Sequence, residues 1–244
     1  MTVLGIDLWA FAALGLVVVI SAAIHRLSGQ GFGTLFAPFM TLIAPDFVPA
    51  SVLILGALVT ALGAGTGLSG IRPKEIAYAA FGRLLGTLPA ILVVGVIAGS
   101  VYLGPAVGAM ILFGVALSLA GLSVPKTPMT LMVAGWLSGF IGTLTSVGAA
   151  PLGLIYQNDK AKSARSTLNA FFLFGVSFSI ASLAIAGLVT SAHVALAAAL
   201  SPFVFAGFAL ATPLSRRTEN LPLKPAALSL AAVGAVVLIL KALW

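Results

Sequence analysis

The sequence lacks cysteine altogether and has little charge: only 7% of its 244 residues are charged, whereas 61% are hydrophobic. Without cysteine, the chain has no disulfide framework, no thiol nucleophile and no thiolate metal site. An ordinary soluble domain has about a quarter of its residues charged, so the composition excludes that class. We therefore expect an all-α integral membrane protein with nearly all of its chain in the bilayer.

Acidic residues are fewer than basic ones, and the net charge is +7. The basic residues occur in short loops between apolar runs, which is the positive-inside pattern and not the basic face of a nucleic-acid-binding domain. We therefore expect the lipid bilayer as a partner and no nucleic acid. Asp7 precedes the first apolar run without a cationic region, so a cleaved signal peptide is not predicted.

Two of the apolar runs, Leu35–Ala44 and Val147–Tyr156, are too short to cross a membrane, because a crossing needs about 20 residues. Each follows a stretch that disfavours a continuous helix, Ser28–Thr34 or Gly139–Pro151, rich in glycine or hydroxyl residues. We predict that both short runs are returning arms of membrane hairpins that meet near the midplane. The longer runs are Leu8–Leu27, Ala50–Leu68, Ile76–Ala98, Val101–Leu122, Met129–Thr143, Ser166–Val189, Val194–Pro213 and Ala226–Trp244.

The distribution of charge predicts the topology. If each hairpin begins and ends on one side and the other six runs cross, nine of the twelve cations fall on one face. The positive-inside rule makes that face cytoplasmic. If Leu8–Leu27 and Met129–Thr143 crossed as ordinary spans, the basic loops would be split between both faces, so we prefer the hairpin arrangement.

This topology gives each half of the chain one broken-helix hairpin and three crossings, which inverts the second half relative to the first. The halves are residues 1–122 and 129–244 of one membrane domain, joined by the linker 123–128. When Pro38 is aligned with Pro151, Gly29 coincides with Gly142. Two inverted repeats with broken helices at their interface are typical of secondary transporters.

Three features together resemble the sulfite exporter TauE/SafE family: Gly31-Phe32-Gly33 followed by Pro38, the second Gly/Ser-Pro break, and the run Lys160–Asn169. The resemblance covers nearly the whole chain. It implies a multi-pass transporter of the cell (inner or plasma) membrane for small sulfur-containing anions, such as sulfite, sulfoacetate or other organosulfonates, often as an exporter. The second break departs from the family's glycine-rich form, because it contains Thr143, Thr145 and Ser146.

The two breaks have the chemistry of an anion site. The N-terminus of a helix carries unpaired N–H groups and a partial positive charge, and glycine lets an oxyanion approach the backbone. The alternative is that the glycines only allow close helix packing; the paired breaks favour the site. The candidate substrate-binding residues are Gln30, Gly31, Gly33, Thr34, Thr143, Thr145, Ser146, Gly148 and Asn169.

Four basic residues could attract the anion. Arg83 lies inside an apolar crossing, where a charge is expensive and is a functional candidate by default, although its side chain could also reach the interface. His25 and Arg26 precede the first break, and Arg165 lies one turn before Asn169. No cofactor and no metal is expected, and a homodimer is compatible with the sequence.

The crossings contain no Asp or Glu away from their ends, and proton relays and sodium sites usually use such carboxylates. The carrier is therefore expected to be a uniporter or exchanger, or to use protons through His25 or the substrate itself. Three alternatives remain: a membrane subunit of a multi-component transporter, an anion channel, and an intramembrane hydrolase. The last would need Ser146 or Ser138 as nucleophile with His193 or His25 as base. We do not expect an enzyme.

Overall fold

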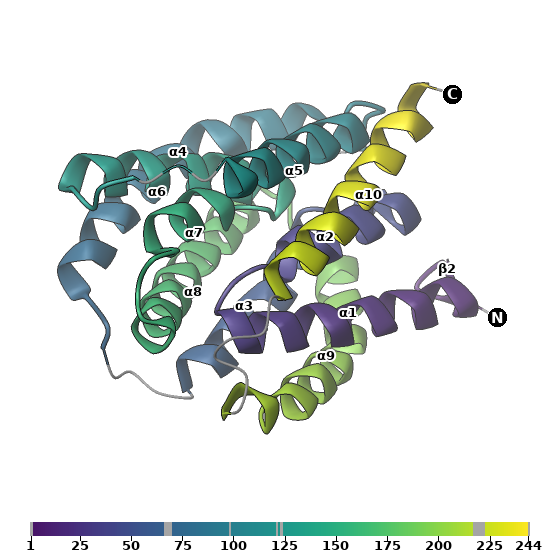
Figure 1. The fold of residues 1–244 in the computed structure, drawn as a ribbon. Coiled ribbons are helices and arrows are strands. Elements are labelled where there is room, and N and C mark those ends of the chain that lie inside the picture. Colours follow the sequence, from purple (N-terminus) through teal and green to yellow (C-terminus); the bar gives the residue numbers. More distant parts are fainter. Residues whose placement is uncertain are drawn as a thin grey trace.

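The structure is a computed structural model that describes residues 2–65, 70–97, 99–120, 122, 124–216 and 223–243. Within these ranges the chain is helical except for its connections and a small antiparallel hairpin, β1 (Thr2–Val3) and β2 (Ile6–Asp7), which the sequence analysis did not predict. Figure 1 shows the helices in chain order: α1 (Leu8–Ser28), α2 (Phe32–Ile43), α3 (Ala50–Gly65), α4 (Pro73–Ile97), α5 (Leu103–Leu119), α6 (Pro128–Thr145), α7 (Ala150–Tyr156), α8 (Ala161–Ile185), α9 (Ser191–Ala211) and α10 (Leu223–Leu243).

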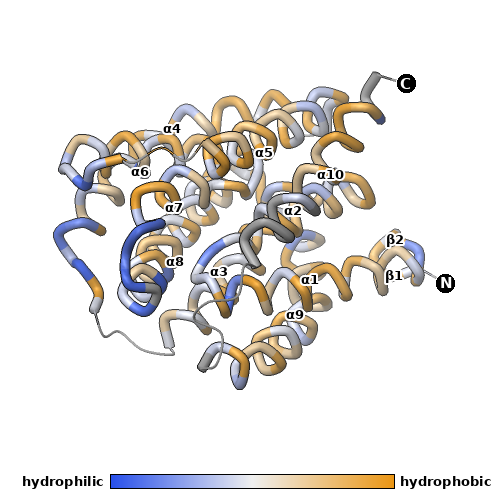
Figure 2. The backbone as a smooth tube through the Cα atoms, viewed as in Figure 1, coloured by the Kyte–Doolittle hydropathy of each residue, from blue (hydrophilic) through white to orange (hydrophobic). Residues whose placement is uncertain are grey.

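Each helix corresponds to one predicted apolar run, and Figure 2 shows hydrophilic residues mainly at the connections and helix ends. Within the described residues, five helices are long and apolar enough to cross a bilayer: α1, α4, α6, α8 and α9. The set includes α1 and α6, which the sequence analysis interpreted as hairpin arms. Length alone would therefore let these two helices cross, whereas the helices that follow them, α2 and α7, are too short to cross back.

The reversal is clear for α6 and α7. Lys126 lies just before α6, and its Nζ is 4.7 Å from the centre of the ring of Tyr156, the last residue of α7. The start of α6 and the end of α7 therefore lie together. In the first half α2 packs back against α1. Near the last turn of α1, Arg26 Nε donates a hydrogen bond of 3.3 Å to Thr212 Oγ1, just after α9, so these two helix ends also meet.

Basic connections gather at one end of the helices. Asp159, in the α7–α8 connection, pairs with Arg72 before α4 and with Lys126 before α6. Arg72 also pairs with Glu75 at 3.5 Å, and Tyr156 donates its hydroxyl hydrogen to Glu75 at 2.7 Å. We call these five residues the ionic cluster. The connections that precede α4, α6 and α8, each of which carries cations, are therefore adjacent.

The opposite end is formed by other connections. His193, in the first turn of α9, donates from Nε2 to the carbonyl of Asp46 at 2.9 Å, and Ser51 Oγ donates to the carbonyl of His193 at 3.0 Å. These bonds join the short 3₁₀ helix η1 (Pro45–Phe47) and the start of α3 to the start of α9. The contacts separate an end with several cations from an end that carries Asp46.

The core consists of two main apolar clusters. The larger surrounds α2 and is contributed by α1, α3, α5, α9 and α10, and the smaller contains side chains of α4, α6, α7 and α8. Figure 1 shows the corresponding arrangement, with α1 beside α9 and α4 beside α6. In the second pair, a Cβ atom on Gly82, Gly86, Gly135 or Gly139 would collide with a carbonyl of the opposite helix. Small residues thus bring α4 and α6 into backbone contact, as is common in membrane proteins.

Candidate functional site

The first break is built by glycines in left-handed conformations. Gly29 ends α1 with φ of +78° and donates its N–H to the carbonyl of His25 at 2.7 Å, and Gly31 precedes α2 with φ of +97°. These are conformations that L-residues with side chains rarely adopt. A Cβ on Gly29 would also collide with Arg165 of α8. The chain can therefore turn tightly here, and the first N–H groups of α2 are left without partners inside the helix.

The second break uses a serine where the first uses glycine. Ser146 has φ of +65°, donates its N–H to the carbonyl of Gly142 at 2.8 Å, and donates its hydroxyl hydrogen to the carbonyl of Pro49 at 3.1 Å. The two breaks touch each other, because a Cβ on Gly33 would overlap the carbonyl oxygen of Ser146. Only a glycine in the first turn of α2 allows this approach.

His25 is buried at the end of α1, with 3% of its surface exposed. Its Nε2 lies 2.9 Å from Oδ1 of Asn169 in α8. An amide oxygen can only accept, so the Nε2 carries the hydrogen of this bond. The other ring nitrogen, Nδ1, has no hydrogen-bond partner among the described residues.

Arg83 is the largest of the fully buried side chains in the described part of the chain, with 1% of its surface exposed. Its Nη1 donates to Ser138 Oγ at 2.8 Å, and its guanidinium lies 5.4 Å from the centre of the Phe171 ring. A Cβ on Gly175 would overlap it, so this glycine of α8 provides the space. Within the described ranges, its Nε has no hydrogen-bond partner and no carboxylate lies within ion-pair distance. The described residues therefore leave this buried charge uncompensated.

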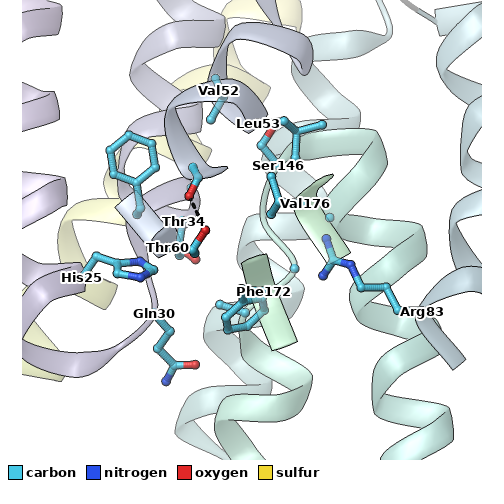
Figure 3. A pocket seen from close by; sticks show the side chains of 17 residues that line it. His25, Gln30, Thr34, Val52, Leu53, Thr60, Arg83, Ser146, Phe172 and Val176 are labelled. Carbon is cyan, nitrogen blue, oxygen red and sulfur yellow. Dashed lines mark hydrogen bonds between the residues drawn. The ribbon is translucent and has the colours of Figure 1, made fainter. Parts of the chain in front are cut away.

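These elements enclose a pocket whose empty volume, counting the space open to solvent, is about 480 Å³. Figure 3 shows His25 and Arg83 extending toward it from opposite sides, with Phe172 between them. None of its lining residues is acidic, and both breaks contribute to it. The lining residues are His25, Gln30, Gly31, Phe32, Gly33, Thr34, Val52, Leu53, Gly56, Thr60, Arg83, Gly142, Ser146, Gly148, Ala149, Phe172 and Val176.

Eight of the thirteen predicted site residues line this pocket: Gln30, Gly31, Gly33, Thr34, Ser146, Gly148, His25 and Arg83. Asn169 is not a lining residue, but it accepts a hydrogen bond from His25, which is one.

The remaining four predicted residues lie outside the lining. The α6 helix continues through Thr145, whose hydroxyl donates to the carbonyl of Ile141 at 2.7 Å. Thr143 Oγ1 bonds instead to Thr87 at 3.2 Å and Ser179 at 2.8 Å. Arg26 lies over Phe208, its Cζ 5.1 Å from the ring centre, and Arg165 packs against Gly29. The polar groups of Thr143, Thr145 and Arg26 therefore have partners elsewhere in the helix bundle.

Sequence reasoning missed the contribution of α3 and most of that of α8. On α8, Phe172 and Val176 follow Asn169 at three and seven residues, which places them on one helix face. On α3, Val52, Gly56 and Thr60 repeat every four residues. This periodicity was available in the sequence, but neither run contains a break that would have drawn attention to it.

The hydrolase arrangement has no counterpart in the described residues. Ser138 accepts a hydrogen bond from Arg83, and Ser146 donates to a backbone carbonyl, so neither hydroxyl is bonded to a histidine. Hydrolysis by a serine nucleophile needs a base within hydrogen-bond reach. Neither serine is therefore an activated nucleophile in the described part of the chain.

Comparison with known proteins identifies a family. The model of a family described as sulfite exporter TauE/SafE matches residues 13–238. No curated protein and no solved structure matches the chain. Exporters are membrane transporters and not enzymes. The five helices of the described chain that are long enough to cross a bilayer agree with a membrane protein. The chain is a multi-pass membrane protein that belongs to the sulfite exporter TauE/SafE family.

Proposed function

We propose that this protein is a secondary transporter that exports small sulfur-containing anions, sulfite or organosulfonates such as sulfoacetate, through the pocket at the paired breaks. The observation that carries the proposal is the uncompensated guanidinium of Arg83 beside the pocket that both breaks line. An unpaired buried charge is costly unless a partner of opposite sign is supplied. A bound anion would be that partner.

The backbone supports the same ligand class. The first turn of α2, at Phe32, Gly33 and Thr34, lines the pocket. Its N–H groups and the positive end of the helix dipole favour negative charge. Thr34 and Ser146 add hydroxyls at the pocket lining. A site that relies largely on neutral donors also suits a carrier, since the anion must leave again.

The packing of helices supports two inverted repeats. Suppose that α1–α5 correspond in order to α6–α10, so that each helix can be replaced by its counterpart in the other half. The packed pair α1–α9 then corresponds to the pair α6–α4, and the pair α2–α10 corresponds to the pair α7–α5. This replacement leaves the α3–α8 and α5–α10 pairs unchanged. All of these pairs pack in the structure. Pro38 and Pro151 are separated by the same number of residues as Pro89 and Pro202, and each pair occupies corresponding helices.

Alternating access would then be a movement of the two apolar clusters relative to each other. The pocket takes His25 and Thr34 from the side of the larger cluster and Arg83 and Phe172 from the side of the smaller one. Rocking of such bodies around a fixed site is the usual carrier mechanism. The positive-inside rule would place the ionic-cluster end in the cytoplasm. The membrane would be the inner or plasma membrane.

Transport by the purified protein in liposomes tests the proposal. Sulfite and sulfoacetate should move saturably, and Thr34→Ala or Ser146→Ala should raise the half-saturating concentration. Ser21→Ala is the matched control, because Ser21 is a buried residue of α1 outside the pocket. Absence of any anion flux or binding would remove the assignment, whereas flux without saturation would indicate a channel. Comparison of right-side-out with inside-out vesicles gives the direction.

A further inference from the structure

The pocket combines one permanent positive charge with an unpaired acceptor, and this combination selects among anions. We infer that the site binds its oxyanion as a monoanion that carries a hydrogen-bond donor, and that His25 Nδ1 accepts this hydrogen. Hydrogensulfite, or a sulfonate with a nearby hydroxyl group, has these properties. The inference rests on the proposed transport function and narrows it, because sulfoacetate with two negative charges becomes a poorer substrate.

The charge of the site follows from its surroundings. Arg83 is the permanently charged residue among those that line the pocket. No Asp or Glu occurs in α1, α2, α3, α8 or α9, the helices around His25. Arg26 is next to His25 in the sequence and Arg165 is in α8, but neither lines the pocket: the first lies over Phe208, and the Cα, Cβ and Cγ of the second pack against Gly29. One negative charge on the ligand therefore balances the positive charge of Arg83. A second negative charge on the ligand would be buried without a partner, which is costly.

The acceptor follows from the bond to Asn169. Since Nε2 of His25 donates to the amide oxygen of Asn169, the neutral ring leaves a bare lone pair on Nδ1. That atom is buried and has no described partner, and the His25 side chain lines the pocket. A fully deprotonated oxyanion offers only lone pairs to it, whereas a protonated one can donate. Asn169 is thus a positioning residue that fixes which ring nitrogen accepts.

Gln30 does not discriminate in the same way. Its Oε1 is also buried without a described partner at the pocket. The amide can turn over and present its NH₂ group instead, so it suits a donor or an acceptor on the ligand. The His25 ring cannot change its free nitrogen from an acceptor to a donor in this way while Nε2 donates to Asn169. The preference for a ligand with a donor therefore depends on His25.

Calorimetric binding to the purified protein in lipid nanodiscs tests the inference with matched ligands. Ethanesulfonate and 2-hydroxyethanesulfonate are both monoanions, and only the second carries a hydroxyl donor. We expect the second to bind about fivefold more tightly, the effect of one hydrogen bond. Sulfite should bind at least about tenfold more tightly at a pH below its second pKa, where it is hydrogensulfite, than at a pH above it. Sulfate should bind weakly at every pH tested. Ethanesulfonate should keep one affinity over the same pH interval, which controls for titration of the protein.

The variants assign the effect to His25. His25→Phe keeps a ring but removes the acceptor, so the preference for the hydroxylated ligand should disappear, while Ser21→Ala should retain it. If His25→Phe does not fold, the two sulfonates on the unaltered protein still decide the question. Equal binding of both sulfonates, tight binding of sulfate, or an equal pH response of ethanesulfonate would overturn the inference and leave the transport proposal standing. Failure of every anion to bind would overturn the transport proposal itself.

Discussion

The contact between the two breaks makes an unusual prediction for Gly33→Ala. Replacing glycine by alanine within a helix normally stabilises it by at most about 1 kcal/mol. At Gly33, however, the new Cβ would overlap the carbonyl oxygen of Ser146. Neither atom can rotate away, because the new Cβ is bonded directly to the backbone and the carbonyl oxygen is part of the backbone. Overpacking of this kind costs about 1–3 kcal/mol, and the rigid pair favours the upper value. The net expectation is a loss of about 2 kcal/mol in the free energy of unfolding.

Gly95→Ala is the matched control. Gly95 lies in α4, and a Cβ added there would meet no neighbouring atom within 4 Å, so this variant should follow helix propensity alone. Reversible unfolding by denaturing detergent, followed by circular dichroism, measures both variants. Anion binding by Gly33→Ala should weaken as well, because the first turn of α2 must move away from the second break. If Gly33→Ala were as stable as Gly95→Ala, the contact between the breaks would be refuted.

Two further predictions concern charge. Arg83→Gln should weaken anion binding by about 10- to 100-fold, as loss of a charge-assisted hydrogen bond does. The variant should be at least as stable, because a buried charge without a counter-ion is removed. Titration calorimetry measures the affinity and thermal unfolding measures the stability, and an unchanged affinity would contradict the proposed site. Asp159→Asn should cost about 1 kcal/mol because the ionic cluster is partly exposed. Burial lowers the pKa of Arg72, but Asp159 and Glu75 outweigh it and raise the pKa overall, so Arg72 stays charged. The cost should shrink in high salt, and a salt-independent cost would exclude an electrostatic origin.

The fold was largely predictable because the length of each apolar run, and the glycine- or hydroxyl-rich stretches that interrupt the runs, indicate where membrane helices begin and end. Ten apolar runs predict ten helices, and the two short runs correspond to α2 and α7. The second break is shorter than predicted, because α6 stays helical from Gly139 through Thr145. The breaks were recognisable because backbone groups in a membrane need satisfied partners. The β1–β2 hairpin was not predictable in this way, since its two-residue strands are too short to show a periodic pattern.

The site was only partly predictable, because sequence reveals a polar residue but not which neighbour satisfies it. Thr143 and Ser146 looked equivalent in the second break, yet Thr143 lies within α6 and bonds to Thr87 and Ser179. Those partners come from α4 and α8, far away in the sequence. Arg83 was equally compatible with the interface and the interior. Its burial depends on Gly175, which leaves space for the guanidinium.

The serine at the second break shows how an apparent departure from the family pattern is accommodated. Left-handed backbone costs a residue with a side chain about 1–2 kcal/mol, which is why glycine is the usual choice. Ser146 offsets part of that cost through its hydroxyl, which donates to the carbonyl of Pro49, and a hydrogen bond is worth about 1 kcal/mol. Its carbonyl meanwhile requires glycine at position 33 of the other break. The serine is therefore accommodated by its own hydrogen bond, while its backbone carbonyl is accommodated by Gly33, and the two breaks form a single structural unit.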